Sequence, residues 1–488
     1  MATNYHIDPD LGSSEGDGTF DDPFESWADL PSMATSDCVY FKCGTTFEPS
    51  SYLSVSWSGT SGSPAVIGAY YSDGGSPAAA VYGVSGNRPI IDGDSNQVPG
   101  NEYYGPSSSY VGLINVNQQD YVQIKDLHVY ESGFYGINFE GDFNDTDCVG
   151  LLVENCKIEK AYVTGIRVQK AKYNYGYIQD NEVTECNLGY GYYDERSDWG
   201  NCITVNNSPY SYTTIRRNYV YSTYGEGIGV YRPFTNSATD NSGYATIEDN
   251  ILFDVQKVGI YIGPAQNNIV RRNIVLGAGS VPGYPGTGTL DDRRWNSSGI
   301  ALWIEGSRVN NTLNNNEVYN NIVTGHYHGI RYGSQYTTGD TLTGNKFYNN
   351  TCIGNRYNFW FGTNLSNYTL TDHEFRNNVS LCPSDCTSVD VSGNYSWMSA
   401  IGKSTNSWHS QPSNWAGTGD VVSDSNWGKI TGWQSITDIS ALSITDFMPL
   451  SNSSVIDAAT DLGSPYNMGI SIYDTSYNIP ISVTTVER

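Results

Sequence analysis

Short runs of alternating apolar and polar residues recur along most of this chain, and an asparagine occurs in each of the runs that follow. They read LLVENCKI, YIQDNEVT, TIRRNYVY, TIEDNILF, IVRRNIVL, EVYNNIVT, KFYNNTCI and EFRNNVSL. Their asparagines are Asn155, Asn181, Asn218, Asn250, Asn273, Asn321, Asn350 and Asn378, at successive separations of 26, 37, 32, 23, 48, 29 and 28 residues. Because alternation with a period of two is typical of β-strands, each run is predicted to be a short strand or pair of strands.

A second kind of run alternates with the first along the chain. Most of its members begin with Gly-Ile: GLINV from 112, GINFE from 136, GIRVQ from 165, CITVN from 202, GIGVY from 227, GIYIG from 259, GIALW from 299, GIRYG from 329 and NFWFG from 358. A repeat as short as 23 residues has room for strands and turns but not for a helix as well. Each repeat is therefore predicted to be one coil of a solenoid of stacked strands, with its apolar residues pointing inward.

The recurring asparagines are predicted to serve the structure of this solenoid rather than its chemistry. Stacking the coils in register places each asparagine next to that of the following coil. Asparagine tolerates left-handed backbone and can satisfy buried turn amides, so the column is expected to form a hydrogen-bonded ladder at one turn.

The composition supports an all-β chain with a substantial core. Its 488 residues are 38% hydrophobic and 13% aromatic, with 52 glycines and 39 tyrosines. Tyr, Val, Ile and Thr between Gly and Asn turns favour strands over helices, and this hydrophobic content argues against disorder. Nine cysteines are too few and too odd in number for a disulfide scaffold, so free core thiols are expected, with Cys38–Cys43 and Cys382–Cys386 as alternative local pairs.

The charge excludes some partners. With 25 Lys+Arg against 51 Asp+Glu, the net charge is −26, which disfavours nucleic acid and anionic membranes. The sequence holds no apolar run long enough for a transmembrane helix. The opening MATNYHIDPDLGSSEGDGTF lacks a basic and an apolar region, so no secretory signal is expected within it. The expected location is extracellular, reached by secretion with the signal removed or by release with a virion.

The repeats and the opening of the chain together resemble a known superfamily. The opening segments are YHIDPDLGSSEGDGTFDDPFESWADL, DCVYFKCGTTFE, SGTSGSPAVIGAY and RPIIDGD. Over residues 5–400 the chain resembles the right-handed parallel β-helix superfamily of pectate-lyase-like polysaccharide lyases, glycoside hydrolases and phage tailspike depolymerases. The resemblance implies a right-handed parallel β-helix that acts on a polysaccharide, and it leaves the reaction open because this fold carries unrelated chemistries.

Three regions are expected along the chain. Residues 1–35 are predicted to form an N-terminal segment in which 24–33 is a short amphipathic helix that caps the first coil. Residues 36–400 are predicted to form the parallel β-helix with groove-forming loops. Residues 401–488, which lose the repeat, are expected to form loops and an irregular C-terminal cap.

Two long insertions indicate where a groove should lie. One repeat carries GYGYYDERSDWGN and another carries GSVPGYPGTGTLDDRRWNSS, each just before a strand of the second kind. Extra residues leave a solenoid as loops, so these insertions are predicted to form two walls at the same corner. A groove is expected across the coils that contain Gly165, Cys202, Gly227, Gly259 and Gly299.

The residues predicted to line this groove suit a sugar chain. In each Gly-Ile run the second and fourth positions face the core, so the third and fifth face outward. These outward positions are rich in rings, amides and guanidinium groups, which stack on sugar rings and bond their hydroxyls, although an ordinary solvated sheet face is the alternative. The candidate substrate-binding residues are Arg167, Asn206, Tyr231, Tyr261, Trp303, His328, Arg331 and Trp360.

Two reactions fit a groove of mixed charge, and the candidate catalytic residues are Lys170, Asp198, Glu226, Arg232 and Glu305. The three carboxylates suit hydrolysis, which needs a carboxylic acid and a carboxylate, although loop salt bridges are the alternative role for Asp198. The two cations suit β-elimination beside a uronate, which needs a base and a positive charge at the sugar carboxylate. Ca²⁺ bound by acidic loop residues is an alternative to that positive charge, but no EF-hand spacing is present and no cofactor is firmly indicated.

The sequence therefore predicts a polysaccharide lyase that cleaves an extracellular uronate-containing polymer. A glycoside hydrolase acting on a neutral or capsular glycan is the first alternative. A non-catalytic, tailspike-like glycan-binding protein is the second. The expected partner is the polysaccharide, and a homotrimer is expected only if the chain belongs to a virion.

Overall fold

The structure is a computed structural model that describes most of the chain. The described residues are 2–93, 112–142, 148–187, 200–208, 210–223, 225–231, 243–277, 297–305, 311–335, 341–362, 370–381, 387–391, 401–404, 406–408 and 421–422. The chain divides into two compact units, Met1–Asn250 and Ile251–Arg488, called the first and the second unit below.

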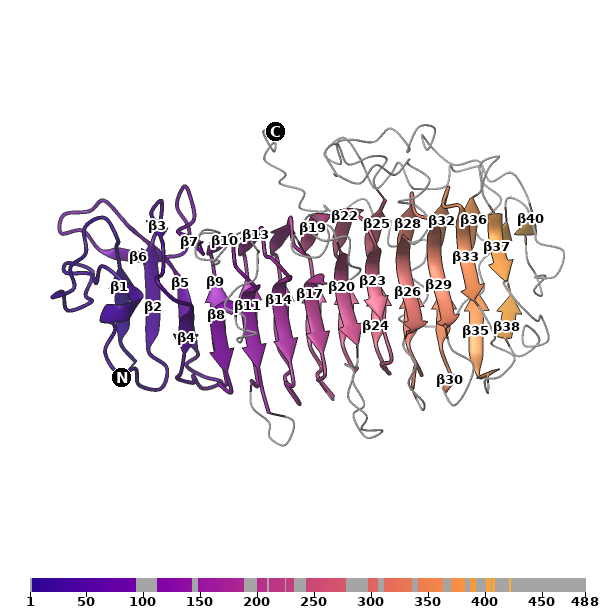
Figure 1. Ribbon diagram of the computed structural model, residues 1–488, viewed down its shortest axis with the longest axis horizontal. Helices are drawn as coiled ribbons and strands as arrows, with labels where there is room; N and C mark the ends of the chain where they lie inside the picture. The colour runs from indigo at the N-terminus through magenta and orange to yellow at the C-terminus, as the bar shows by residue number, and fades with distance from the viewer. Residues whose placement is uncertain are drawn as a thin grey trace. The chain divides into compact units, whose positions relative to one another are not determined.

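The first unit consists of three parallel sheets whose strands follow one another coil by coil (Figure 1). Sheet A contains β1 (Asn4–Ile7), β2 (Cys38–Lys42), β5 (Ala65–Ser72), β9 (Val122–Lys125), β12 (Leu152–Glu154), β15 (Tyr177–Gln179), β18 (Thr214–Arg216) and β21 (Thr246–Glu248), with β6 (Ala80–Tyr82) antiparallel to β5. Sheet B contains β3 (Thr46–Phe47), β7 (Ile90–Asp92), β10 (His128–Tyr130), β13 (Lys157–Glu159), β16 (Glu182–Thr184) and β19 (Tyr219–Thr223). Sheet C contains β4 (Leu53–Val55), β8 (Gly112–Asn117), β11 (Tyr135–Glu140), β14 (Thr164–Gln169), β17 (Asn201–Asn206) and β20 (Glu226–Tyr231).

The second unit repeats the three-sheet arrangement. Its sheet A contains β24 (Ile269–Arg271), β27 (Glu317–Tyr319), β31 (Lys346–Tyr348), β35 (His373–Arg376) and β38 (Ile401–Ser404). Its sheet B contains β22 (Ile251–Val255), β25 (Ile274–Leu276), β28 (Ile322–Thr324), β32 (Thr351–Ile353), β36 (Val379–Leu381), β39 (Ser407–Trp408) and β40 (Val421–Val422). Its sheet C contains β23 (Val258–Ile262), β26 (Ser298–Ile304), β29 (His328–Ser334), β33 (Tyr357–Gly362) and β37 (Thr387–Val391), and β30 (Leu342–Thr343) pairs with β34 (Leu370–Thr371). Both units are parallel β-helices, as predicted.

The core is built from columns of identical or similar apolar residues. In the first unit the register aligns Ile114, Ile137, Ile166, Ile203 and Ile228, which are all fully buried. Because the coils stack in register, each of these side chains packs on the one above and below it, so burial on this inner side drives the stacking.

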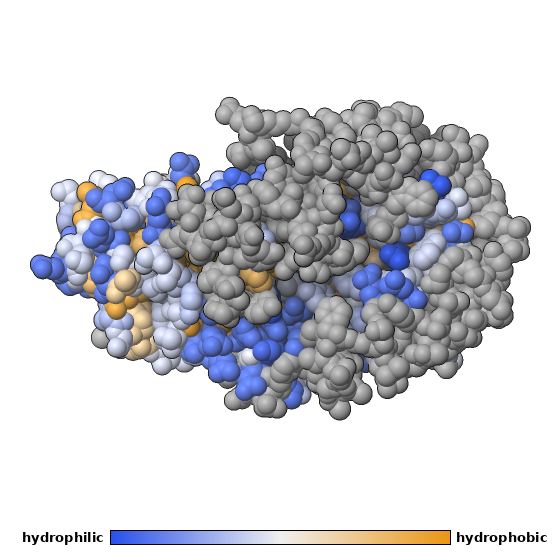
Figure 2. All heavy atoms as spheres, viewed as in Figure 1, coloured by the Kyte–Doolittle hydropathy of each residue, from blue (hydrophilic) through white to orange (hydrophobic). Residues whose placement is uncertain are grey.

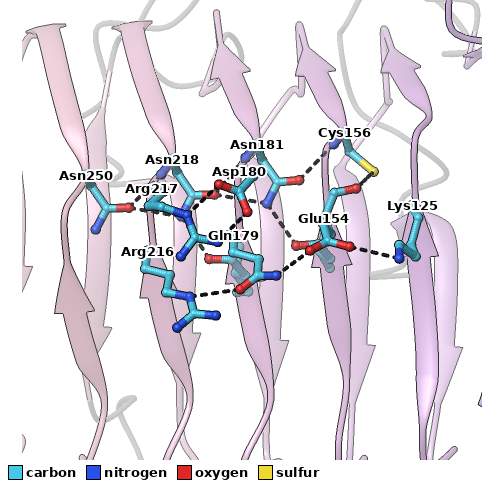
Figure 3. A network of polar contacts seen from close by, with 12 residues as sticks. Lys125, Glu154, Cys156, Gln179, Asp180, Asn181, Arg216, Arg217, Asn218 and Asn250 are labelled. Atoms are coloured by element: carbon cyan, nitrogen blue, oxygen red, sulfur yellow. Dashed lines mark hydrogen bonds and ion pairs between the residues drawn. The ribbon is translucent and has the colours of Figure 1, made fainter. Parts of the chain in front are cut away.

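The predicted asparagine ladder is present in the first unit (Figure 3). Asn181 Nδ2 donates to Asn218 Oδ1 at 2.9 Å, and Asn218 Nδ2 donates to Asn250 Oδ1 at 3.0 Å. The prediction for Asn155 is wrong by one position. Cys156 occupies that place in the column, since its backbone N–H donates to Asn181 Oδ1, whereas Asn155 has φ 51° and donates to the carboxylate of the preceding coil. The left-handed residue thus precedes the ladder position, and the ladder asparagines themselves are buried.

Two such ladders lie in the described part of the second unit. The predicted one runs through Asn273, Asn321, Asn350 and Asn378 and continues to Asn406, with Nδ2 to Oδ1 distances of 3.0–3.3 Å. A ladder that the repeat did not predict runs through Asn268, Asn316 and Asn345. Its asparagines precede β24, β27 and β31 by one residue, where the sequence motif is less regular.

The N-terminal segment differs from the expected helical cap, whereas most of the expected C-terminal cap lies outside the described residues. In place of an amphipathic helix over 24–33, the structure has a single 3-10 turn, η1 (Trp27–Asp29), because Ser26 caps that turn and Pro31 opposes helical continuation. Trp27 stacks on Phe41 with ring centroids 6.1 Å apart. Parallel pairing also begins with β1, before residue 36, and continues through β38 to β40, beyond residue 400.

The described cysteines are all free, as predicted. They are Cys38, Cys43, Cys148, Cys156, Cys186, Cys202 and Cys352. Cys382 and Cys386 lie outside the described residues. Along the part of the chain that the structure describes, no helix has the length and apolar content needed to cross a membrane.

Candidate functional site

The outward side of sheet C in the first unit, called the first-unit face, carries two rows of polar side chains. The register aligns the positions predicted to face outward in two rows, one of Asn115, Asn138, Arg167, Thr204 and Gly229 and another of Asn117, Glu140, Gln169, Asn206 and Tyr231. Figure 2 shows hydrophilic residues gathered over the lower ends of β8, β11 and β14 as drawn in Figure 1. A face this polar can bind hydroxyl and carboxylate groups.

Two cations share one carboxylate on this face. Lys170 follows β14 directly, and its Nζ lies 2.7 Å from Glu140 Oε1. Arg167 Nη1 lies 4.0 Å from Glu140 Oε2 and donates to Asn138 Oδ1 at 3.2 Å. The Arg167 guanidinium also lies 4.5 Å from the centroid of the Tyr135 ring, which supports it from one side. The Lys170–Arg167–Glu140 cluster thus places two basic side chains next to one carboxylate on this face.

Beside this cluster lies a group of buried polar side chains. Asn206 Nδ2 donates to the Tyr231 hydroxyl at 3.4 Å, and Asn201 Nδ2 donates to Glu226 Oε2. Burial, together with the nearby charge of Glu226, raises the pKa of Tyr231, so its phenol stays protonated. The Oδ1 atoms of Asn201 and Asn206 are buried acceptors without a hydrogen-bond partner in this structure. These acceptors suit the hydroxyl groups of a bound sugar.

An aromatic and cationic cluster lies on the outward side of sheet C in the second unit, called the second-unit face. The Arg331 guanidinium lies 3.8 Å from the Trp303 ring centroid and 5.0 Å from that of Trp360. The register places Gly333 and Gly362 in the same row as Trp303. A Cβ on Gly333 would lie 2.8 Å from Trp303 Cζ3, so this glycine leaves the space in which the indole lies across the sheet. Burial lowers the pKa of Arg331 to about 10, which leaves it charged at neutral pH.

The other predicted residues of this unit lie next to the same cluster. The Tyr261 hydroxyl donates to the backbone oxygen of Trp303 at 3.1 Å. Burial raises the pKa of Glu305, and the charge of Arg331 opposes that shift. The ring of His328 lies 4.7 Å from that of Trp360. The structure therefore brings Tyr261, Trp303, His328, Arg331 and Trp360 together, with Glu305 within electrostatic reach of Arg331.

We expect His326 and His328 to remain neutral through the physiological range. Burial lowers the pKa of each from 6.5 to about 3, and for His328 the charge of Arg331 adds to this. Between pH 6.5 and about pH 3 these two histidines bind more protons in the unfolded chain than in the folded chain. Their contribution to the free energy of unfolding is therefore highest above about pH 6.5 and falls as the pH drops toward 3. An NMR titration should show no change of either imidazole between about pH 5 and 8, and replacing both with Gln should weaken the acid dependence of stability. Titration of either ring near pH 6.5 would contradict this expectation.

The sequence analysis named Glu226 and His328 from a further set of outward residues but missed the other members, such as Tyr135 and Asn201. The residue before each Gly-Ile pair faces outward because the glycine itself turns toward the core: a Cβ on Gly136 would lie 2.9 Å from Ile158 Cγ2. This places Tyr135 beside Arg167 and Asn201 beside Glu226. Strict alternation from the isoleucine assigns these positions to the interior, so the recurring glycine was the only available signal.

Two predicted catalytic residues and the groove walls fall outside the described residues. Asp198 belongs to 188–199, Arg232 to 232–242, and the second insertion to 278–296. The acidic residues considered as Ca²⁺ ligands lie in the same segments. Within the ranges that the structure describes, no group of three or more His, Cys, Asp and Glu side chains is placed to hold a metal ion.

Comparison with known proteins agrees with this fold. Residues 112–318 match the family described as right handed beta helix region. The chain is 27% identical over 140 residues to pectate lyase PEL9 of Emericella nidulans, a match that covers 28% of this chain and 30% of that protein. Among solved structures it is similar to pectate lyase Pel9A, with a TM-score of 0.54 and 18% identity over 94% of this chain and 92% of the other. It is also similar to the GH136 lacto-N-biosidase from Eubacterium ramulus, with a TM-score of 0.44 and 15% identity over 79% of this chain and 65% of the other.

The fold and the family match agree with each other. Both units are parallel β-helices, and residues 112–318, less than half of the chain, match the family described as right handed beta helix region. The curated relative is matched over less than a third of its length, and the likeness to solved structures concerns the fold. The chemistry therefore has to be argued from the side chains on the two faces.

Proposed function

We propose that this protein is a polysaccharide lyase that cleaves an extracellular uronate-containing polymer by β-elimination at the first-unit face. The observation that carries the proposal is the Lys170–Arg167–Glu140 cluster, in which two cations share one carboxylate on an outward sheet face. A guanidinium group at that place suits a sugar carboxylate, and the amine next to it suits a base. The names of the relatives PEL9 and Pel9A, both pectate lyases, are consistent with a substrate of this class.

The proposed reaction assigns a separate role to each cation. Lys170 Nζ, in its neutral form, takes the proton from the carbon next to the uronate carboxylate. That electron pair forms a carbon–carbon double bond as the bond to the glycosidic oxygen breaks, and the leaving oxygen takes up a proton. Arg167 stabilises the negative charge that develops on the carboxylate during proton removal. The protonated phenol of Tyr231 is the proposed proton donor to the leaving oxygen.

The second-unit face is proposed as a sugar-binding region. Trp303 and Trp360 offer ring surfaces, and Arg331 between them offers a charge for a second carboxylate. The net charge of −26 repels a polyanion at long range, so local cations are needed to hold it. Salt screens that long-range repulsion, with a Debye length of about 10 Å at ~0.1 M.

The chemical structure of the product distinguishes elimination from hydrolysis. We expect the purified protein, incubated with polygalacturonate and with alginate, to release oligosaccharides that carry a double bond conjugated with the carboxylate and therefore absorb in the ultraviolet. The expected result is an increase in ultraviolet absorbance in step with new reducing ends. New reducing ends without that absorbance would replace elimination by hydrolysis, and binding without either product would show a non-catalytic glycan-binding protein.

A glycoside hydrolase is the second candidate, and Glu305 is the observation that favours it. Burial raises the pKa of this carboxyl group, which is the change that a general acid needs in order to be protonated at neutral pH. The same product assay on neutral glycans tests this alternative, with Glu305→Gln expected to lose activity only if the hydrolase proposal is correct.

A further inference from the structure

A column of tyrosines follows the turns between sheets C and A of the first unit. Tyr121, Tyr175, Tyr212 and Tyr244 occupy these turns, and Gly150 stands between the first two. Their φ angles are 51°, 52°, 50°, 64° and, for the glycine, 67°. We call these four tyrosines, together with Tyr173 and Tyr210, the tyrosine stripe. Its member Tyr173 comes three residues after Lys170, in the turn between β14 and β15.

The rings of the stripe lie against one another from coil to coil. Tyr175 and Tyr212 stack with centroids 4.8 Å apart and planes 2° apart, and the Tyr244 ring lies 5.2 Å from that of Tyr212. A Cβ on Gly150 would lie 2.6 Å from Tyr121 Cδ1, so the Tyr121 ring covers the glycine and fills its place in the column. The result is a row of aromatic rings that repeats with the coils.

Two of these rings are exposed and the others are half-buried, and the backbone beneath them does not favour tyrosine. The exposed fraction is 57% for Tyr175 and 37% for Tyr212. A left-handed backbone at a turn favours Gly, Asn or Asp, because a bulky side chain crowds the neighbouring carbonyl oxygen. Gly, Asn or Asp would form each of these turns with less backbone strain. The tyrosine rings must therefore serve a purpose other than forming the turn.

Two cations accompany the stripe. Lys172 Nζ lies 5.2 Å from the centroid of the Tyr173 ring. The Arg216 guanidinium lies 4.7 Å from the ring of Tyr177, a further tyrosine with an exposed fraction of 41%. In a chain with a net charge of −26, exposed rings next to cations form a local surface that suits an anionic ligand with flat apolar faces.

We infer that the tyrosine stripe is a second binding site for an acidic polysaccharide, continuous with the turn that carries Lys170. The spacing of the coils and the charge of the surface both suit this ligand. Neighbouring coils are about 4.8 Å apart, which is close to the length that one sugar residue adds to an extended chain. The identity of the ligand rests on the proposed function, since the same polymer would be held by the stripe and cut at the first-unit face. Holding it there raises its local concentration at the cluster.

The test is polymer binding by the full chain, measured by affinity electrophoresis in gels that contain polygalacturonate, alginate or uncharged dextran. The variant Tyr175→Asn/Tyr212→Asn keeps the left-handed turns, because Asn tolerates them, and removes two rings. We expect its binding of the acidic polymers to be about tenfold weaker, as for the loss of two aromatic contacts. Its Tm should change by less than about 4 °C, because lost stacking and relieved backbone strain have opposite signs. The control Tyr52→Asn, at an equally exposed site outside the stripe, should bind like the wild type.

Unchanged affinity of the double variant would overturn the inference, as would an equal loss in the control or no binding by the wild type. If the double variant does not fold, Lys172→Gln/Arg216→Gln replaces it, with weaker binding of acidic polymers expected and unchanged affinity counting against the site. The assay needs no turnover. Weaker binding by the variant without any cleavage would overturn only the proposed reaction, and cleavage with unchanged binding would overturn only the stripe.

Discussion

Replacing Lys170 with alanine is expected to lower kcat on a uronate polymer by about 10³-fold, within the range by which a general base accelerates proton removal. The polymer should still bind through Arg167, so KM is expected to change much less than kcat. The matched control is Lys160→Ala. Lys160 Nζ also reaches back to a carboxylate, since it lies 3.3 Å from Glu131 Oε1. Lys160 lies in the turn between β13 of sheet B and β14 of sheet C, outside the two polar rows of the first-unit face. Its loss should leave kcat unchanged.

A second variant separates a base from a structural ion pair. Glu140→Gln keeps the shape of the side chain but removes the charge that lies 2.7 Å from Lys170 Nζ. If Lys170 is the base, this variant should keep much more activity than Lys170→Ala. An equal loss of kcat in the two variants, or full activity of Lys170→Ala, would show that Lys170 does not perform the proton transfer.

Replacing Asn218 with alanine is expected to lower the free energy of unfolding by about 4 kcal/mol, the largest stability effect foreseen for a single polar residue here. The side chain accepts from the backbone N–H and the Nδ2 of Asn181, and it donates to Asn250 Oδ1 and to the oxygen of Ile178. The truncation leaves these buried groups without a partner, and each such group costs about 1–3 kcal/mol. Urea unfolding followed by circular dichroism measures the effect.

The control for this prediction is Asn155→Gly. Asn155 was expected in the same ladder but lies one residue before it, half-buried and with φ 51°. Glycine keeps that backbone conformation, so only the side-chain hydrogen bonds are lost, at a cost of about 1 kcal/mol. Equal destabilisation by the two variants would contradict the assignment of Asn218 to the ladder and Asn155 to the turn.

The candidate site was predictable as a set of outward positions but not as a set of contacts. Alternation along GIRVQ predicts Arg167 to face outward, and the register aligns it with Asn138 and Thr204 of the neighbouring coils. The pairing of Lys170 with Glu140 joins residues 30 positions apart, and their meeting depends on how many residues the intervening turns contain. The same holds for Trp303, whose ring occupies space that a Cβ on Gly333, 30 residues later, would crowd.

The sequence by itself determined the strands, the coil repeat and most of the asparagine ladder. The strands follow from the alternation of apolar and polar residues, which acts between neighbours in the sequence. The coil repeat and the ladder follow from the similarity of successive repeats, which brings like residues into register. The tertiary structure decided which charges share a partner, why the residue before each Gly-Ile pair faces outward, and that His326 and His328 are buried enough to stay neutral. Those properties depend on the solvent exclusion and the spacing between coils, and neither is encoded in any single segment of the chain.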